Sequence, residues 1–270
     1  MSAFKNGLFA NKLAVITGGG SGINLRIAER FAQQGAKLGI IGRKQEKLDG
    51  AVEKLKSLDT AAIGISADVR DYPSLSRAIA EIHSALGPID ILVCGAAGNF
   101  PAMAAGMSSN AFKSVVDIDL LGTFNACRAA YEFLRKPGAV IINISAPQAF
   151  TPMPLQSHVC AAKAGVDMIT RTLAIEWGPE GVRVNSIVPG PIDDTEGMTR
   201  LAANQQVRDT LTHSIPLRRF GTKDDIAEVA IFLGSESASY ISGTVMVCDG
   251  GQSLLGSGPW VEGLALGAKK

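Results

Sequence analysis

A glycine-rich run near the start of the chain could bind a phosphate. Thr17-Gly-Gly-Gly-Ser-Gly-Ile-Asn24 follows a short apolar stretch and opens a helical pattern. Glycines let the backbone turn tightly and approach a pyrophosphate, and the positive end of a helix favours its negative charge. A plain glycine-rich turn is the alternative for an isolated run, but the strand and helix on either side favour a dinucleotide site. The residues assigned to it are Gly18, Gly20, Ser21, Gly22 and Ile23.

The end of the second apolar stretch, Gly42-Arg43-Lys44, indicates which dinucleotide would bind. A carboxylate at this place holds the ribose hydroxyls of NAD, and none is present. The guanidinium of Arg43 can instead pair with a 2′-phosphate, which favours NADP(H), although a solvated charge at a helix start is the alternative. Asp68 could accept a hydrogen bond from the adenine, or could simply form a turn, and both interpretations stay open. Val69, the next residue, is assigned to the same cofactor site.

Short stretches that are apolar throughout alternate with longer amphipathic ones along the chain. Strands of this kind, separated by helices, indicate parallel βαβ units, and right-handed crossovers then make a doubly wound α/β sheet. No linker divides the series, so a single domain over residues 1–270 is expected. Residues 193–213 break the rhythm and could form a mobile substrate lid. The predicted strands are 13–17, 37–42, 61–66, 89–93, 139–144, 183–188 and 244–248, and the predicted helices are 23–34, 45–57, 73–86, 110–134, 158–176 and 223–233.

The composition excludes several classes of protein. Hydrophobic residues make up 46% of the chain and charged residues 19%, which is typical of a globular protein with a large core. The 26 basic and 25 acidic side chains leave a net charge of +1, so neither nucleic acid nor a membrane surface is expected as a partner. The four cysteines lack the spacing of metal ligands, so no metal site is expected. A cytoplasmic protein is expected, because neither a signal peptide, nor a membrane-spanning stretch, nor a peroxisomal C-terminal tripeptide is evident.

Two further motifs, together with the glycine run, give the chain its resemblance to the short-chain dehydrogenases/reductases. Pro189-Gly-Pro-Ile192 follows the sixth predicted strand, and Asp249-Gly-Gly251 follows the last. The resemblance implies a seven-stranded parallel sheet and a homodimer or homotetramer, commonly formed through the two long helices. It also implies that the Pro-Gly turn meets the nicotinamide end of the cofactor. On this ground Pro189, Gly190 and Ile192 are assigned to that end, and Ala96 is assigned to the same cofactor site.

The residues with which this family normally performs alcohol chemistry, Asn, Ser, Tyr and Lys, are largely replaced. Lys163 matches the lysine, but Val159 stands four residues earlier in place of the tyrosine. Ala146 replaces the serine, and Asp119 replaces the asparagine. Interconverting a ketone and an alcohol needs a proton donor at the carbonyl oxygen, which valine and alanine cannot supply. An ordinary alcohol dehydrogenase is therefore not expected.

The remaining pattern is similar to the 2,4-dienoyl-CoA reductases, and most of all to their peroxisomal type. The specific feature is Ala-Ala-Gly-Asn-Phe at residues 96–100, combined with the missing tyrosine and serine. Residues 94–100 as a whole match these reductases, although residues 94–97, Cys-Gly-Ala-Ala, replace the Asn-Asn-Ala-Gly that is usual in the short-chain dehydrogenases/reductases. Two features depart from these reductases: Asn24 replaces their third glycine, and the peroxisomal C-terminus is absent. The other matching stretches are 109–113, 117–119, His158 ahead of 161–163, 176–178, and 189–192 running into 195–197.

A conjugated dienoyl thioester suits a site without a tyrosine. The resemblance implies that hydride from NADPH adds at the delta carbon of a 2,4-dienoyl-CoA and that charge flows to the thioester oxygen. A proton then reaches the alpha carbon and gives a 3-enoyl-CoA, so no tyrosine beside the carbonyl is required. The resemblance also implies that Asp119 and Lys163 are catalytic and deliver this proton through a bound water, with Lys163 on the nicotinamide ribose. The alternative for Asp119 is a carboxylate that bends a helix and is tied to the backbone.

Several polar and aromatic residues could contact the acyl-CoA. Asn99 and Phe100 follow the fourth predicted strand, at the end where ligands bind in such sheets. Asn99 could donate to the thioester oxygen and Phe100 could flank the diene, while a turn residue and a core aromatic are the alternatives. His158 precedes the tyrosine position, and a helix turns it about 100° away, which favours a structural or interface role. Arg200 could reach a CoA phosphate, although a solvated surface charge is favoured.

Two other functions stay open. One is another enoyl-thioester reductase of the same fold, which acts on a 2-enoyl chain. The other is a catalytically silent protein that binds the cofactor, as the joint loss of Tyr, Ser and Asn would predict. The retained Lys163, the acquired Asp119 and the intact Pro-Gly turn weigh against a silent protein.

Overall fold

Strand β1, Leu13–Thr17, lies inside a sheet of seven parallel strands in the computed structural model, which describes residues 7–195, 198 and 204–257. All of its side chains are buried, because both faces of the sheet are covered. The strand order is β3-β2-β1-β4-β5-β6-β7, which confirms the doubly wound sheet. The other strands are β2 Lys37–Gly42, β3 Ala62–Ser66, β4 Ile91–Cys94, β5 Val140–Ile144, β6 Arg183–Pro189 and β7 Val245–Cys248.

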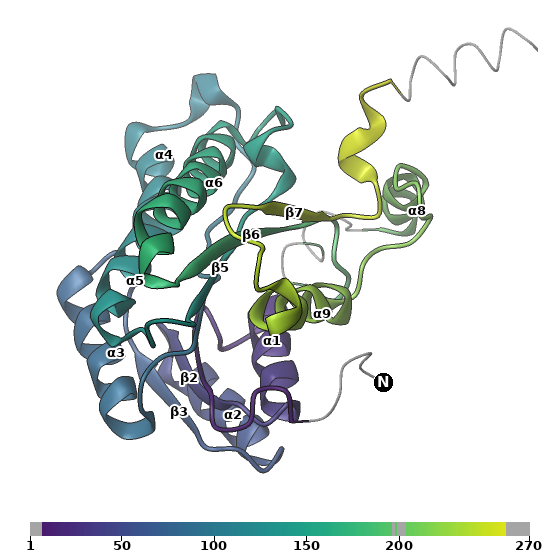
Figure 1. Ribbon diagram of the computed structural model, residues 1–270. Helices are drawn as coiled ribbons and strands as arrows, with labels where there is room; N and C mark the ends of the chain where they lie inside the picture. The colour runs from purple at the N-terminus through teal and green to yellow at the C-terminus, as the bar shows by residue number, and fades with distance from the viewer. Residues whose placement is uncertain (1–6, 196–197, 199–203, 258–270) are drawn as a thin grey trace, which may run out of the picture.

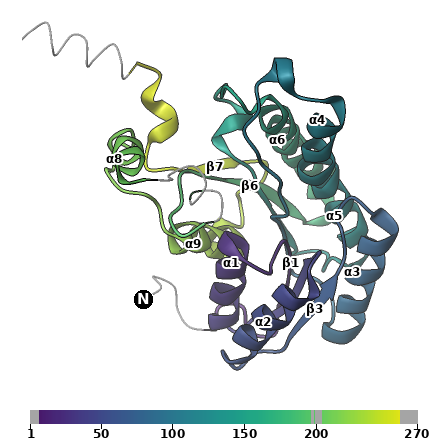
Figure 2. The same ribbon diagram turned by 180° about the vertical axis from the view of Figure 1, so that it is seen from behind.

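Helices cover both faces of this sheet (Figures 1 and 2). Successive side chains of a strand point to opposite faces, so Ala14 and Ile16 of β1 enter one core while Leu13 and Val15 enter the other. The first core is closed by α1 Gly22–Gln33, α2 Gln45–Lys56 and α9 Lys223–Gly234. The second core is closed by α3 Tyr72–Leu86, α5 Gly122–Ala130 and α6 Ser157–Trp177. The described helices also include α4 Ser109–Val116 and α8 Gln205–His213.

Two segments differ from the expected elements. The helix predicted over 110–134 is interrupted by a π-helical turn at Asp117–Leu121 and ends in a 3-10 turn at Tyr131–Phe133. A single widened turn does not change the hydrophobic periodicity of the sequence enough to be predicted. Such turns are frequent at functional sites. Residues 205–213, expected to be irregular, form α8, whose first turn is capped by the side chain of Asn204. The lid itself stays a prediction.

Within residues 7–195, 198 and 204–257, no helix is both long and apolar enough to cross a membrane. The same part of the chain holds no group of three or more His, Cys, Asp or Glu side chains placed to bind a metal ion. All four cysteines are free, and the sulfur atoms of Cys94 and Cys127 lie 3.8 Å apart in the core.

Candidate active site

The sheet changes its winding direction at β1, whose neighbours are β2 and β4. Connections that leave in opposite directions open a crevice at the carboxyl ends of the strands, where ligands bind in such folds. A cavity of about 530 Å³ lies at these strand ends. Among the residues assigned to the cofactor, those that line it are Gly18, Gly20, Ser21, Gly22, Ile23, Arg43, Asp68, Val69 and Ala96.

Two glycines of this cavity are required by the backbone. Gly18 has a φ of +72° and Gly22 a φ of +62°, a left-handed conformation that residues with a Cβ rarely adopt. A Cβ on Gly18 would also lie 3.0 Å from the Cα of Ala96. The β1–α1 turn therefore packs closely on the residues after β4, and it leads into the N-terminus of α1, where a pyrophosphate is favoured. These residues fit a dinucleotide.

Three basic side chains line the same cavity. Arg43 and Lys44 follow β2, and Lys47 lies in the first turn of α2. Their charge suits a 2′-phosphate and agrees with the assignment of NADP(H). Lys47 was not predicted as a site residue from the sequence. Its helical spacing of three residues from Lys44 is the signal that could have found it.

Arg43→Ala is expected to raise the KM for NADPH about 10- to 100-fold and to leave the KM for NADH within about twofold. Only NADPH carries the 2′-phosphate, and a hydrogen bond to a charged group contributes about 1.5–3 kcal/mol. Initial rates with each cofactor at saturating acyl-CoA measure the effect. Lys56→Ala, which removes an exposed charge at the other end of α2, is the matched control. An equal rise in KM for both cofactors would mean that Arg43 acts through the overall positive charge of the cavity and does not contact the 2′-phosphate.

Asp68 lines the cavity, but its carboxylate is already engaged by Arg70. Nη2 of Arg70 lies 2.6 Å from Oδ2 of Asp68, and the backbone N–H of Arg70 donates to Oδ1 at 3.0 Å. The hydrogen bond from the Arg70 side chain lowers the pKa of Asp68, and partial burial opposes it. The backbone hydrogen bond is the one that a turn-forming aspartate makes. The adenine contact stays a prediction.

Asn24 and Gly95 face each other, and each differs from the residue that is usual in the short-chain dehydrogenases/reductases. Nδ2 of Asn24 donates to the carbonyl oxygen of Gly95 at 2.7 Å. A Cβ added to Gly95 would overlap the Asn24 side chain. The family's pattern is the reverse, with glycine at position 24 and asparagine at position 95. The amide of Asn24, on α1, therefore fills the space that a side chain at position 95 would occupy.

Asn24→Gly and Gly95→Asn are each expected to lower the free energy of unfolding by about 1–3 kcal/mol. The first deletes a hydrogen bond and places glycine in a helix, and the second overpacks the site. The double variant restores the family's arrangement and should lose less than the sum of the singles by at least about 1 kcal/mol. Urea unfolding measures all four proteins. Additive losses would mean that the two positions do not share this space.

A buried ion pair lies beside the cavity. Nζ of Lys163 is 3.1 Å from Oδ2 of Asp119, and the two side chains are only 7% and 1% exposed. Nζ also donates at 2.9 Å to the carbonyl oxygen of Ile144, a residue that lines the cavity. The backbone N–H of Gly98 donates to Oδ1 of Asp119 at 2.7 Å. Asp119 thus lies in the π-helical turn with one oxygen tied to the backbone, as the structural alternative predicts, and the other facing the lysine.

No phenol takes the place of the missing tyrosine. Val159 is 3% exposed and packs with Val115 and Ala162 in a small apolar cluster. Of the described residues that line the cavity, Ser21 and Thr195 alone carry a hydroxyl group. The three tyrosines of the chain lie outside that lining, and they are Tyr72, Tyr131 and Tyr240. The described residues of the site therefore include no phenol that could act as the acid in carbonyl reduction.

Asp167 is a buried carboxyl that the sequence analysis did not single out. It lies one helical turn after Lys163 on α6 and is 4% exposed. Burial raises its pKa, while the nearby hydroxyl groups of Ser145 and Ser186 and the positive charges of Arg171 and Lys163 oppose the rise. Its spacing of four residues from Lys163 on a helix is the signal that could have found it.

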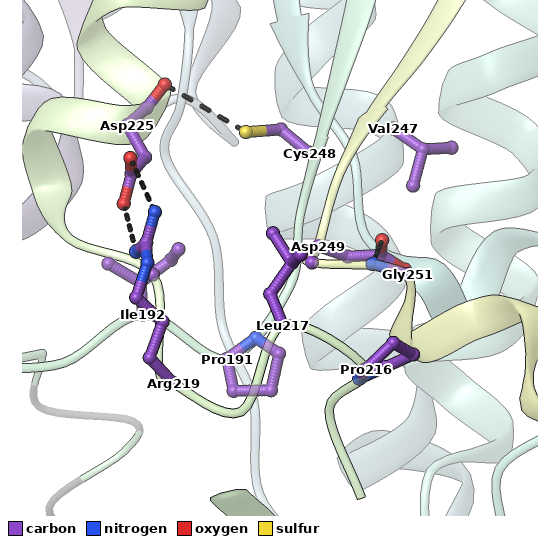
Figure 3. Close-up of a pocket in the computed structure, with 12 residues that line it drawn as sticks. Pro191, Ile192, Pro216, Leu217, Arg219, Asp225, Val247, Cys248, Asp249 and Gly251 are labelled. Carbon is purple, nitrogen blue, oxygen red and sulfur yellow. Dashed lines mark hydrogen bonds and ion pairs between the residues drawn. The ribbon is translucent and has the colours of Figure 1, made fainter.

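The turn after β6 lies against the end of β7. A Cβ on Gly190 would lie 2.5 Å from the Cα of Asp249, so only glycine fits there. Pro191 and Ile192 line a second cavity of about 540 Å³ (Figure 3), while Thr195 of the same segment lines the first. Pro189, Gly190 and Ile192 do not line the first cavity, and their contact with the nicotinamide stays a prediction.

The residues assigned to the acyl-CoA are only partly brought together. Asn99 is exposed just past β4. Phe100 is half-buried, its ring centroid lies 4.5 Å from that of His158, and it packs on the Val159 cluster. Its place beside the diene stays a prediction. His158 is fully buried, and neither ring nitrogen has a hydrogen-bond partner among the described residues, which fits a structural role. Arg200 lies outside the described residues.

The fold and the site together define a dinucleotide-binding oxidoreductase with a lysine–carboxylate pair in place of the usual tyrosine. A family model described as enoyl-(acyl carrier protein) reductase matches residues 18–253. The chain belongs to the short-chain dehydrogenase/reductase family.

Known relatives confirm the resemblance to dienoyl-CoA reductases. The chain is 44% identical to a peroxisomal 2,4-dienoyl-CoA reductase [(3E)-enoyl-CoA-producing] of Arabidopsis thaliana, over 93% of this chain and 87% of that protein. It is 46% identical to a protein of the same description from Rattus norvegicus, over 90% of this chain and 84% of that protein. The crystal structure of a short chain dehydrogenase from Bacillus anthracis superposes with a TM-score of 0.81 at 39% identity, covering 90% and 96% of the two chains.

Proposed function

We propose that this protein is an NADPH-dependent reductase that converts a 2,4-dienoyl-CoA into a 3-enoyl-CoA. The observation that carries the proposal is the buried Asp119–Lys163 pair beside a cavity whose described lining contains no phenol. A site of this kind suits a reaction whose proton ends on carbon instead of a carbonyl oxygen. The names of the relatives from Arabidopsis thaliana and Rattus norvegicus support the same substrate class.

The glycine run from Gly18 to Ile23 would hold the pyrophosphate of the cofactor, and Arg43 with Lys44 and Lys47 would hold its 2′-phosphate. Lys163 is assigned to the nicotinamide ribose. When bound, NADPH supplies a hydride to the delta carbon of the dienoyl chain.

The chain's own side chains would handle the charge and the proton. Asn99, exposed at the carboxyl end of β4, donates a hydrogen bond to the thioester oxygen, where negative charge develops in the dienolate. Oδ2 of Asp119 has no hydrogen bond within the described part of the chain, so it can accept one from a water beside Lys163. Asp119 and Lys163 hold this water and pass a proton to the alpha carbon. One hydride and one proton thus enter the substrate, and the product is the 3-enoyl-CoA.

NADPH oxidation with three substrates tests the proposal. A 2,4-dienoyl-CoA should be reduced rapidly, whereas a 2-enoyl-CoA and simple ketones should not. With NADPH deuterated at the transferred position, the label should be found on the delta carbon of the product. Reduction of ketones alone would overturn the mechanism, and reduction of the 2-enoyl-CoA would favour the other enoyl-thioester reductase. NADPH binding without turnover of any acyl-CoA would favour the silent protein.

The assembly proposed is a homodimer or homotetramer through the helices around α5 and α6. Met168 and Ile175 are 58% and 78% exposed and lie seven residues apart, on one face of α6. Leu121 and Phe124 are 42% and 43% exposed where α5 begins. Sedimentation equilibrium measures the assembly. The four free cysteines support a reducing, cytoplasmic compartment.

A further inference from the structure

Three side-chain amides form a hydrogen-bonded chain that ends at Asn99, the residue proposed to contact the thioester oxygen. Nε2 of Gln148 donates to Oε1 of Gln156 at 2.6 Å, and Nε2 of Gln156 donates to Oδ1 of Asn99 at 3.2 Å. The three residues come from the loop after β5, the position before α6 and the loop after β4. The backbone N–H of Ala102 donates to the carbonyl oxygen of Leu155 at 2.8 Å, so the two loops are also joined by their backbones.

Each amide in this chain donates to the next one, and the thioether of Met153 fixes this donor-to-acceptor direction. Nε2 of Gln148 also donates to the sulfur of Met153 at 3.5 Å. A thioether accepts hydrogen bonds but has no proton to donate, so the amino group of Gln148 must face it. The second proton of that amino group goes to Gln156, whose own amino group is thereby turned toward Asn99.

The direction decides what Asn99 offers to a ligand. A side-chain amide carries its acceptor on one atom and its donors on the other, so the atom held inside determines the atom left outside. Oδ1 of Asn99 accepts from Gln156, which leaves Nδ2 for a ligand. Asn99 is exposed, whereas Gln156 is only 5% exposed. A donor stabilises a developing oxyanion, and an outward carbonyl oxygen would repel it.

We propose that Gln156 is a positioning residue that holds Asn99 with its amino group toward the thioester oxygen of the substrate. This inference rests on the proposed function, because it concerns the donor for the negative charge of that reaction. Gln156 acts through Asn99 and does not touch the substrate. The amide chain thus makes the site selective for a substrate that presents an oxygen acceptor beside β4.

Gln156→Glu tests the direction, because a carboxyl group changes from donor to acceptor as it ionises. When protonated, it can accept from Gln148 and donate to Asn99, as the amide does. When ionised, it only accepts, so it draws Nδ2 of Asn99 inward and turns Oδ1 toward the substrate. We expect kcat for a 2,4-dienoyl-CoA to be about 100-fold below wild type near pH 8.5, because one oxyanion donor contributes about 10²–10³-fold. Near pH 5.5 it should recover to within about tenfold, because burial raises the pKa of a carboxyl group.

Two controls separate this mechanism from packing and from simple charge. Gln156→Leu removes the hydrogen bond to Asn99 without reversing it, so kcat should fall about tenfold at every pH, less than with the ionised carboxyl group. If Gln156 served packing alone, leucine would be the worse variant, and kcat of neither variant would depend on pH. Asn99→Ala removes the residue through which Gln156 acts. In that background Gln156→Glu should change kcat less than about threefold, whereas direct repulsion of the substrate would persist. Ratios to wild type at each pH remove the titrations that all the proteins share.

The possible failures are distinguishable. If the wild-type protein does not reduce dienoyl-CoA, the proposed function fails and the inference falls with it. If the wild type is active and Asn99→Ala equals it, Asn99 is not the donor and the inference is overturned alone. If Asn99→Ala is impaired but Gln156→Glu follows Gln156→Leu at every pH, Asn99 remains the donor and the direction of the chain is irrelevant. Thermal unfolding and NADPH fluorescence confirm that each variant is folded and binds the cofactor.

Discussion

Asp119→Asn is expected to lower kcat for a 2,4-dienoyl-CoA about 1000-fold, while the KM values for NADPH and acyl-CoA change less than about threefold. Asparagine has nearly the same shape, and its Oδ1 can still accept from the backbone of Gly98. It cannot carry the negative charge that pairs with Lys163, nor relay a proton from a bound water. A positioned acid–base group contributes about 10²–10⁴-fold to a rate. Steady-state rates over a pH series measure the effect.

Asp117→Asn is the matched control for this variant. Asp117 lies in the same π-helical turn and carries the same charge, but it pairs with Lys113 near the surface. Its replacement should leave kcat within about twofold. An asparagine at position 119 that retained near-normal activity would remove Asp119 from the proton path, whatever its ion pair contributes to folding.

Lys163→Met is expected to lower kcat by a similar factor and also to destabilise the fold by about 3 kcal/mol. Methionine is unbranched and only one atom shorter than lysine, but it leaves the carboxylate of Asp119 buried without its partner. Removing one member of a buried pair costs about 3–5 kcal/mol. The carbonyl oxygen of Ile144 loses a hydrogen bond as well. Urea unfolding and dienoyl-CoA reduction measure the two effects separately.

The double variant Asp119→Asn/Lys163→Met separates folding from catalysis. With both charges removed, most of the lost stability should return, because no unpaired ion remains in the interior. Activity should stay as low as in the single variants, because the proton path is absent. Recovery of activity together with stability would mean that the pair serves the fold alone.

Much of the fold could be predicted because a strand inside a parallel sheet is apolar at successive positions, a pattern that is visible in a short stretch of sequence. The β1 segment is apolar at four successive positions, which suits a strand covered on both faces, and the structure buries every one of its side chains. The glycine run could be assigned for a similar reason, since Gly18 and Gly22 adopt a conformation that glycine favours. Helix α8 was missed because it is short and mostly polar: Val207 and Leu211 are its only apolar residues, too few to show a helical period in the sequence.

The sequence by itself determined the family, the sheet, the glycine-rich turn after β1 and the absence of a tyrosine four residues before Lys163, because each of these depends on residue type and short-range spacing. The tertiary structure alone decided which atoms meet. It paired Asp119 with Lys163 across elements 44 residues apart, placed Asn24 in the space beside Gly95, and oriented Asn99 through Gln156. Distances between side chains from different strands and helices depend on how those elements pack, and no local pattern in the chain records that packing.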